Sequence, residues 1–232
     1  ASRISSGPRS TLRSGTRRVT GNDQMLATIQ GITLLAGIVA LMWLIEIINT
    51  LDSNKLDGDG IWPRDFGRLW GILTAPFLHV SFAHLIANTV PFVFMGLIIA
   101  LRGAARLALV TLVVILVGGL GTWLIAPSNS PTVGASGVVF GYATYLLARG
   151  LFDRSVLELL TGAVVGVVWG GALLSSLVPH YGISWQGHAC GAIGGVVAAY
   201  LLRREPAHTG RGRPGAGRLP GTPGPAGGLL SK

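Results

Sequence analysis

Residues 134–141 read Gly-Ala-Ser-Gly-Val-Val-Phe-Gly, and they place one serine, Ser136, inside a long apolar part of the chain. A single histidine, His188, lies in a second apolar stretch further on. Polar and ionisable side chains within membrane-type sequence are costly, so each is a functional-site hypothesis by default. Ser136 and His188 are therefore the two residues around which we interpret the rest of the sequence.

The composition is that of a membrane protein. Half of the 232 residues are hydrophobic and only 12% are charged, whereas soluble domains have about 25% charged residues. The net charge of +9 does not indicate a nucleic-acid partner, because the basic residues cluster at the ends of the apolar blocks. Cys190 is the sole cysteine, which excludes an internal disulfide. We interpret Cys190 as a small core residue. The arginine-, glycine- and alanine-rich composition is associated with GC-rich genomes, so we expect a bacterial cell-membrane protein.

The apolar blocks predict an all-α polytopic membrane protein with six transmembrane helices. We expect a disordered basic tail over residues 1–24, a six-span domain over 25–202, and a disordered Gly/Pro/Arg-rich tail over 203–232. A long polar loop is expected between the first and second spans. The spans are expected at residues 25–49, 80–101, 105–126, 136–149, 156–178 and 185–202.

Charge asymmetry predicts the orientation. Of the 18 Lys and Arg residues, 15 fall on the side that holds both tails, and Lys55, Arg64 and Arg68 fall on the other. Basic residues accumulate on the cytoplasmic side of membrane proteins. Both termini are therefore expected to be cytoplasmic, with the loop over residues 50–78 outside.

The fourth span is predicted to be short. Residues 136–149 would form a helix of about 21 Å, less than the roughly 30 Å of a hydrocarbon core. The preceding run contains Pro127 and Pro131, which interrupt a helix. Irregular backbone at membrane depth is tolerated only where protein buries it or water reaches it. The sequence thus predicts a cavity at the outer end of the fourth span, with Ser136 at its floor.

Polar residues recur at the same depth in neighbouring spans. His84 and Asn88 lie in the opening turns of the second span, four residues apart and so on one helix face. Glycines four residues apart also occur in the fourth span and in the sixth. Such ridges let helix backbones approach closely in lipid, which would bring Ser136 next to His188. The glycines are Gly137 and Gly141 in the fourth span, and Gly187, Gly191 and Gly195 in the sixth.

Three motifs in this order resemble those of the rhomboid family of intramembrane serine proteases. They are His84-x-x-x-Asn88, Gly134-x-Ser136-Gly137, and His188-x-x-Gly191-x-x-x-Gly195, and the resemblance covers roughly residues 25–202. Two positions differ from the family pattern: Trp70 is followed by Gly71 rather than arginine, and Phe140 stands where the family often has tyrosine. The phenylalanine retains a face that can stack on His188.

The resemblance implies a serine-type endopeptidase that cleaves transmembrane protein substrates in or near their spans, at a small residue. Ser136 would be the nucleophile, with His188 as general base and then general acid, in a dyad without a carboxylate. Asn88, His84 and the Ser136 backbone N–H are candidates for stabilising the oxyanion. No cofactor, metal or nucleic acid is expected, and the oligomeric state is left open.

Other interpretations remain beside this one. Ser136 alone could be a small packing residue, and His188 or Asn88 alone could be interhelical hydrogen-bonding residues. His79 is interpreted as a loop or packing histidine. A non-catalytic rhomboid-like protein that binds membrane clients is the main alternative, and a small transporter is a second. The sequence lacks the G-x-S-x-G elbow, because Val138 occupies its last position, and it lacks H-E-x-x-H.

Overall fold

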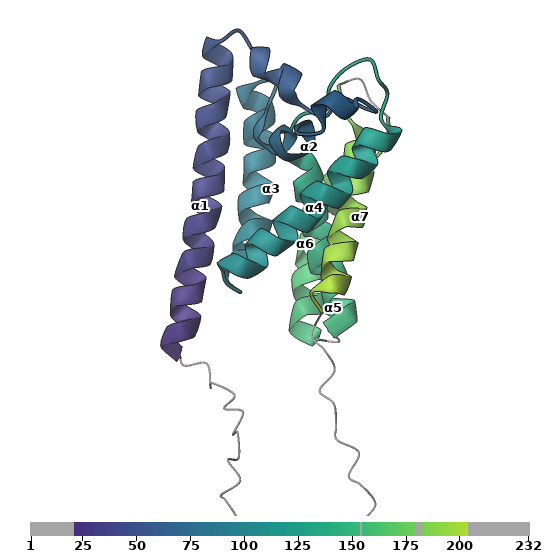
Figure 1. Ribbon diagram of the computed structural model, residues 1–232. Helices are drawn as coiled ribbons and strands as arrows, with labels where there is room; N and C mark the ends of the chain where they lie inside the picture. The colour runs from purple at the N-terminus through teal and green to yellow at the C-terminus, as the bar shows by residue number, and fades with distance from the viewer. Residues whose placement is uncertain (1–20, 154, 180–181, 204–232) are drawn as a thin grey trace, which may run out of the picture.

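The computed structural model describes residues 21–153, 155–179 and 182–203, and these form seven α-helices (Figure 1). The described residues contain an isolated β-bridge between Ile61 and Thr132 but no strand, so the expected all-α class is confirmed. The helices are α1 Gly21–Leu51, α2 Gly71–Thr74, α3 Phe82–Ala100, α4 Ala104–Ile125, α5 Ser136–Asp153, α6 Val156–Ser175 and α7 Trp185–Leu201.

The predicted spans correspond to the six long helices, with two corrections. Helix α1 begins at Gly21, so residues 21–24 are helical and not part of a disordered tail. Most of the two expected tails lies outside the described residues. Helix α5 continues to Asp153 instead of ending at residue 149, which gives a length of about 27 Å. The prediction ended this helix too early because Arg149 suggested a solvated loop, whereas Arg149 is buried and paired.

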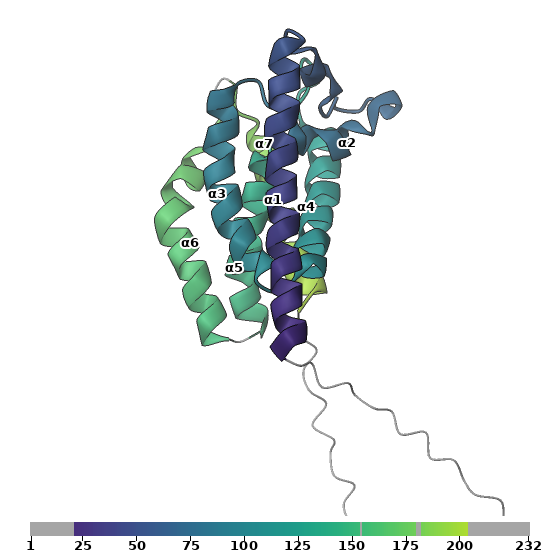
Figure 2. The same cartoon turned by 90° about the vertical axis from the view of Figure 1, so that its left-hand side faces the viewer.

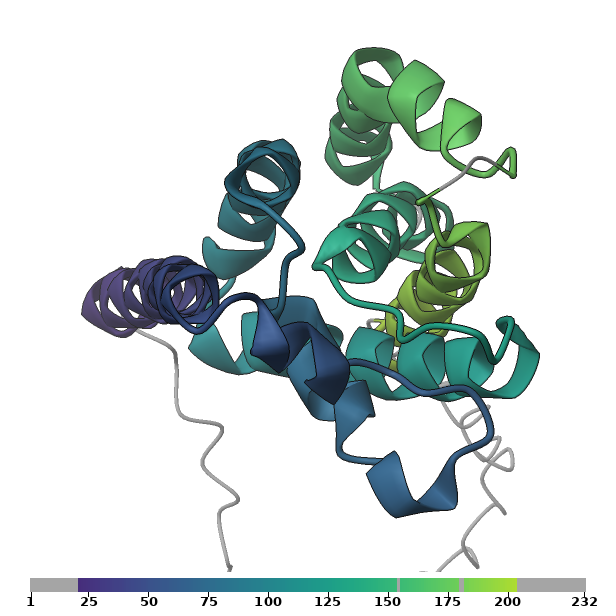
Figure 3. The same cartoon turned by 90° about the horizontal axis from the view of Figure 1, so that it is seen from above.

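Four helices of the described chain, α1, α3, α4 and α6, are long and apolar enough to cross a membrane. Together with the seven-helix architecture, they make this a multi-pass membrane protein. Helix α5 contacts α3, α4, α6 and α7, and lies among them when the bundle is viewed along its length (Figure 3). A helix enclosed by protein can carry polar and small residues that lipid would disfavour, which explains its lower hydropathy.

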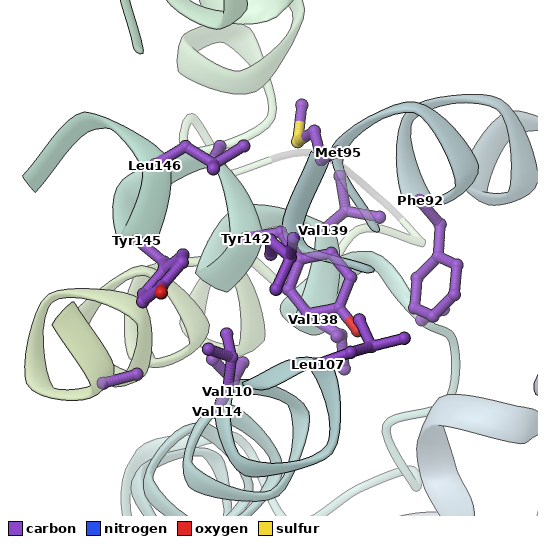
Figure 4. Close-up of a cluster of buried hydrophobic side chains, with 14 of the residues drawn as sticks. Phe92, Met95, Leu107, Val110, Val114, Val138, Val139, Tyr142, Tyr145 and Leu146 are labelled. Atoms are coloured by element: carbon purple, nitrogen blue, oxygen red, sulfur yellow. The ribbon is translucent and has the colours of Figure 1, made fainter. Parts of the chain in front are cut away.

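The apolar core lies around α5. Tyr142 and Tyr145 are fully buried and pack with side chains from α3 and α4 (Figure 4). Helix α6 stands at the edge of the bundle (Figure 2), and only Glu158, Gly162 and Val165 of its residues are buried. The site-bearing helix is thus held firmly, whereas α6 is held along a narrow stripe.

Glycines bring α5 and α7 into backbone contact, as the sequence predicted. A Cβ added at Gly191 would overlap the carbonyl of Gly137, and one added at Gly195 would overlap the carbonyl of Gly141. Small residues of this kind allow close helix packing without side chains between the backbones. The contact sets the spacing between the first turns of α5 and α7.

The loop between α1 and α3 packs over one end of the bundle and supports the segment before α5. Ile61 exchanges backbone hydrogen bonds of 2.9 and 3.0 Å with Thr132. Arg64 donates to the carbonyls of Leu124 and Ala126, each at 2.9 Å, and also hydrogen-bonds Ser128. The irregular segment before Ser136 is therefore hydrogen-bonded to this loop at two places, through Ile61 and through Arg64.

A cluster of charged residues holds the other end. Arg149 is 2% exposed and pairs with Asp153 at 3.0 Å and Glu158 at 3.1 Å. Arg149 also donates to the Tyr145 hydroxyl at 2.6 Å, and Arg102 pairs with Glu158. Because Glu158 belongs to α6, the cluster fastens the first turn of α6 to α5 and to the α3–α4 turn.

Candidate active site

Helix α5 begins at Ser136 because the backbone turns sharply just before it. Gly134 has a φ of +116°, a conformation that side-chain-bearing residues rarely adopt. Its N–H donates to the Ala75 carbonyl at 2.9 Å, and the Ala135 carbonyl accepts the N–H groups of Val138 and Val139. The first turn of α5 therefore presents Ser136 at a fixed position next to the start of α7.

Ser136 and His188 meet across the glycine contact. The Oγ of Ser136 lies 3.0 Å from Nε2 of His188, within the range needed for proton transfer. His188 is 7% exposed and sits in the first turn of α7, where the Ser184 hydroxyl accepts the Gly187 N–H at 3.2 Å and caps the helix. The structure thus brings together the serine and histidine that the sequence singled out.

The second ring nitrogen of His188 is held by a backbone carbonyl. Its Nδ1 lies 2.9 Å from the oxygen of Ser176, the residue that follows α6. A carbonyl oxygen can only accept, so Nδ1 carries the proton and Nε2 is left free to accept from the serine hydroxyl. Neither Ser176 nor its carbonyl was identified from the sequence, because a backbone acceptor leaves no residue-type signal.

Phe140 supports the imidazole from one face. The two rings are nearly parallel, at 7°, with centroids 4.4 Å apart. Phe140 lies one turn after Ser136 on the same helix, so α5 supplies both the hydroxyl and the surface on which the histidine rests. The stacking expected for Phe140 is confirmed.

Asn88 and His84 lie on the α3 side of the serine. The Asn88 side-chain nitrogen donates to the His84 carbonyl at 3.1 Å, and Asn88 is only 6% exposed. The His84 ring lies directly against Gly134, since a Cβ built there would be 2.6 Å from the ring carbon Cε1. Both side chains therefore border the turn that carries Ser136.

An open cavity of about 780 Å³ connects these groups. Ser136, His188, His84 and Asn88 all line it, as do Pro131 and neighbours in the segment before α5. The cavity thus lies at the start of α5, beside Ser136; that this end of the helix faces outward stays a prediction. Across the described ranges, no group of three or more His, Cys, Asp or Glu side chains is placed to hold a metal ion.

His79 was interpreted from the sequence as a loop or packing histidine, and the structure gives it a closer relation to the site. Its Nε2 lies 3.4 Å from the Ala135 N–H, and its ring meets the His84 ring edge-to-face at 5.1 Å. Burial, and to a smaller extent His84, lower the pKa of His79 from 6.5 to about 4. His79 is thus a neutral hydrogen-bond acceptor for the N–H of Ala135, the residue directly before Ser136.

Comparison with known proteins places the chain. An uncharacterized protein of Mycobacterium tuberculosis is 44% identical over 182 residues, covering 75% of this chain and 76% of that protein. The putative rhomboid protease YdcA of Bacillus subtilis is 29% identical over 136 residues, 58% of this chain and 68% of that protein. The rhomboid protease GluP of Bacillus subtilis is 30% identical over 154 residues, 65% of this chain and 28% of that protein. Since residues 67–205 match the Rhomboid domain, this chain belongs to the rhomboid family.

Proposed function

We propose that this chain is an intramembrane serine endopeptidase that hydrolyses peptide bonds in or near transmembrane segments of other membrane proteins. The observation that carries the proposal is the 3.0 Å approach of Ser136 Oγ to His188 Nε2 at the edge of an open cavity. Covalent acyl transfer needs a nucleophile within hydrogen-bond reach of a base, and a third group that fixes the orientation of that base.

In this mechanism Ser136 Oγ attacks the scissile carbonyl while its proton passes to His188 Nε2. The tetrahedral intermediate collapses, His188 returns the proton to the leaving amine, and an acyl-enzyme on Ser136 remains. Water, deprotonated by His188, then attacks the ester, and His188 returns that proton to Ser136 Oγ as the acid product leaves. The Ser176 carbonyl accepts from Nδ1–H throughout, and so orients the ring where a triad would use a carboxylate.

The developing oxyanion requires donors on the α3 side of Ser136. Asn88 carries two N–H donors, of which one is taken by the His84 carbonyl, and both residues line the cavity. The Ser136 N–H lies at the start of α5, where the helix dipole adds partial positive charge. We assign Asn88, His84 and this N–H to oxyanion stabilisation.

The proposed topology has six spans, α1 and α3 to α7, with both tails cytoplasmic. Arg102 and Arg149 lie at the end of the bundle where α1 starts and α7 ends, and the loop over residues 52–81 lies at the opposite end (Figure 1). That arrangement fits the positive-inside rule. The cavity then faces outward, where an extended segment of a transmembrane protein can reach Ser136.

The test is labelling and cleavage by the full chain in proteoliposomes. A fluorophosphonate probe should label the wild type and not Ser136→Ala, and a transmembrane test substrate should be cut only by the wild type. His188→Ala should also abolish cleavage, and the double variant should be no worse, because nucleophile and base act as a unit. Cleavage by Ser136→Ala would exclude the mechanism. Substrate binding without labelling or cleavage by the wild type would instead favour a client-binding role.

A further inference from the structure

We propose that His79 is a positioning residue, whose neutral imidazole holds the peptide unit ahead of the nucleophile in the orientation that the reaction needs. This inference rests on the proposed function of Ser136. It assigns a role in that reaction to a histidine that lies outside the spans and outside the Ser136–His188 pair.

The segment before Ser136 is fixed by the N–H groups of two consecutive residues, which donate to a backbone carbonyl and to a side chain of one short stretch of chain. The Gly134 N–H donates to the Ala75 carbonyl at 2.9 Å, and the Ala135 N–H donates to Nε2 of His79 at 3.4 Å. Ala75 and His79 bracket the short helical turn that precedes α3. The two bonds therefore set the direction of both peptides that lead into Ser136.

The imidazole of His79 is itself held in place. His79 is fully buried, and its carbonyl accepts from the Asn49 side chain at 3.3 Å. The same Asn49 nitrogen donates to Asp57 at 2.9 Å, and the Asn49 oxygen accepts the Leu56 N–H at 2.9 Å. The outer end of α1 thus anchors His79 through a buried amide that is itself fully engaged.

The second histidine closes the other side of the same turn. The His84 ring lies against Gly134 and meets the His79 ring edge-to-face at 5.1 Å. The turn is consequently held between two imidazoles, one in contact with Gly134 and the other accepting from Ala135. Since Gly134 has a positive φ, a small rotation there would swing the Ser136 hydroxyl relative to His188.

The chemistry of His79 fits this role. An imidazole can accept at Nε2 only when it is neutral with its proton on Nδ1. Burial favours the neutral ring, because it lowers the pKa to about 4, and the Ala135 N–H that points at Nε2 places the proton on Nδ1. The Ala135 N–H is then satisfied by His79 and directed away from the substrate, and the next N–H, that of Ser136, serves the oxyanion.

Two substitutions separate positioning from simple packing. His79→Leu fills a similar volume without an acceptor, and His79→Gln supplies an amide oxygen at nearly the reach of Nε2. Each variant is compared with wild type by kcat per serine titrated with the fluorophosphonate probe, by KM for a transmembrane test substrate, and by labelling rate. Thr111→Val is the matched control, since it removes a hydrogen bond to Tyr142 of α5 far from the start of that helix.

We expect His79→Leu to lower kcat per titrated serine about tenfold to a hundredfold, with KM within about twofold, and to slow labelling equally. His79→Gln should recover most of the loss, and Thr111→Val should lower stability without changing kcat per titrated serine. If His79→Leu turns over normally per titrated serine, the positioning role is wrong while the protease assignment stands. If the wild type is not labelled at all, the proposed function itself fails.

Discussion

Phe140 and His188 stack almost face to face, with ring centroids 4.4 Å apart and planes 7° from parallel. The stack limits the imidazole to one plane, and the Ser176 carbonyl limits its rotation within that plane. One contact from α5 and one from the residue after α6 thus fix the ring, as the proposed mechanism requires of its base in place of a triad carboxylate.

Replacing Phe140 should leave His188 in place but give its imidazole more orientational freedom. Aromatic pairs contribute roughly 0.5–1.5 kcal/mol beyond their buried area, so Phe140→Leu is expected to slow turnover per titrated serine by about three- to tenfold. Phe140→Tyr should stay close to wild type because the stacking face is retained. Equal activity of the leucine and tyrosine variants would mean that stacking does not orient His188.

Asn88→Ala should show how much the Asn88 side chain contributes to stabilising the oxyanion. Loss of one oxyanion donor typically costs about 10²–10³ in kcat. Steady-state cleavage in proteoliposomes should therefore show a large fall in kcat with KM little changed, and His84→Ala should be milder than either dyad change. A wild-type kcat for Asn88→Ala would remove Asn88 from the mechanism and leave Ser136 and His188 untouched.

The glycine contact can be tested by adding a single methyl group. A Cβ at Gly191 would overlap the Gly137 carbonyl, so Gly191→Ala should destabilise the fold by about 1–3 kcal/mol and separate the hydroxyl from the imidazole. Gly171→Ala on α6 is the control, because nothing lies within 4 Å of a Cβ there. Denaturant unfolding and cleavage should both be impaired in the first variant only.

The charged cluster at the end of the bundle opposite the α1–α3 loop should be far more sensitive to substitution than an exposed ion pair. Arg149→Leu leaves Glu158 and Asp153 buried without this partner, and breaking such a cluster typically costs about 3–5 kcal/mol. Asp52→Asn breaks the exposed pair with Lys55 and should cost less than about 1 kcal/mol. Comparable unfolding midpoints for the two variants would show that the cluster does not fasten α6.

His79 should make stability depend on pH. Its folded pKa of about 4 lies below the ordinary value of 6.5, so the unfolded chain takes up a proton first as the pH falls. Above pH 6.5 there is no penalty; between 6.5 and 4 the folded state loses up to roughly 3 kcal/mol relative to the unfolded state, and below 4 the loss is constant. Subtracting the unfolding free energies of His79→Gln from those of wild type across this window isolates the effect. A flat difference would contradict it.

Much of this fold was predictable because a lipid environment restricts the backbone structures that a sequence can adopt. Long apolar segments in lipid are expected to be helical, and glycines four residues apart favour close contact between two helices. The order of the helices and the approach of Gly137 to Gly191 followed from these two rules. The end of α5 did not, since Arg149 has the same residue type whether it lies in water or is buried against carboxylates.

The candidate site was predictable where it consists of side chains and not where it consists of backbone groups. Ser136, His188, His84 and Asn88 stand out because polar residues are rare in apolar helices. The carbonyls of Ser176 and Ala75 have no such signal, and their positions depend on loops that only the folded chain defines. His79 was underestimated for the same reason: its partner is a peptide N–H that no residue type reveals.

The attachment of His188 to Ser176 carries one further consequence. Ser176 directly follows α6, a 20-residue helix that is fastened at its first turn by Glu158 and whose exposed side chains are mostly apolar. A bilayer too thin or too thick for such a helix is accommodated by tilting it. Tilt of α6 about its fastened end would shift the carbonyl that selects the imidazole tautomer, so membrane thickness would be a variable of the acid–base chemistry in the proposed protease.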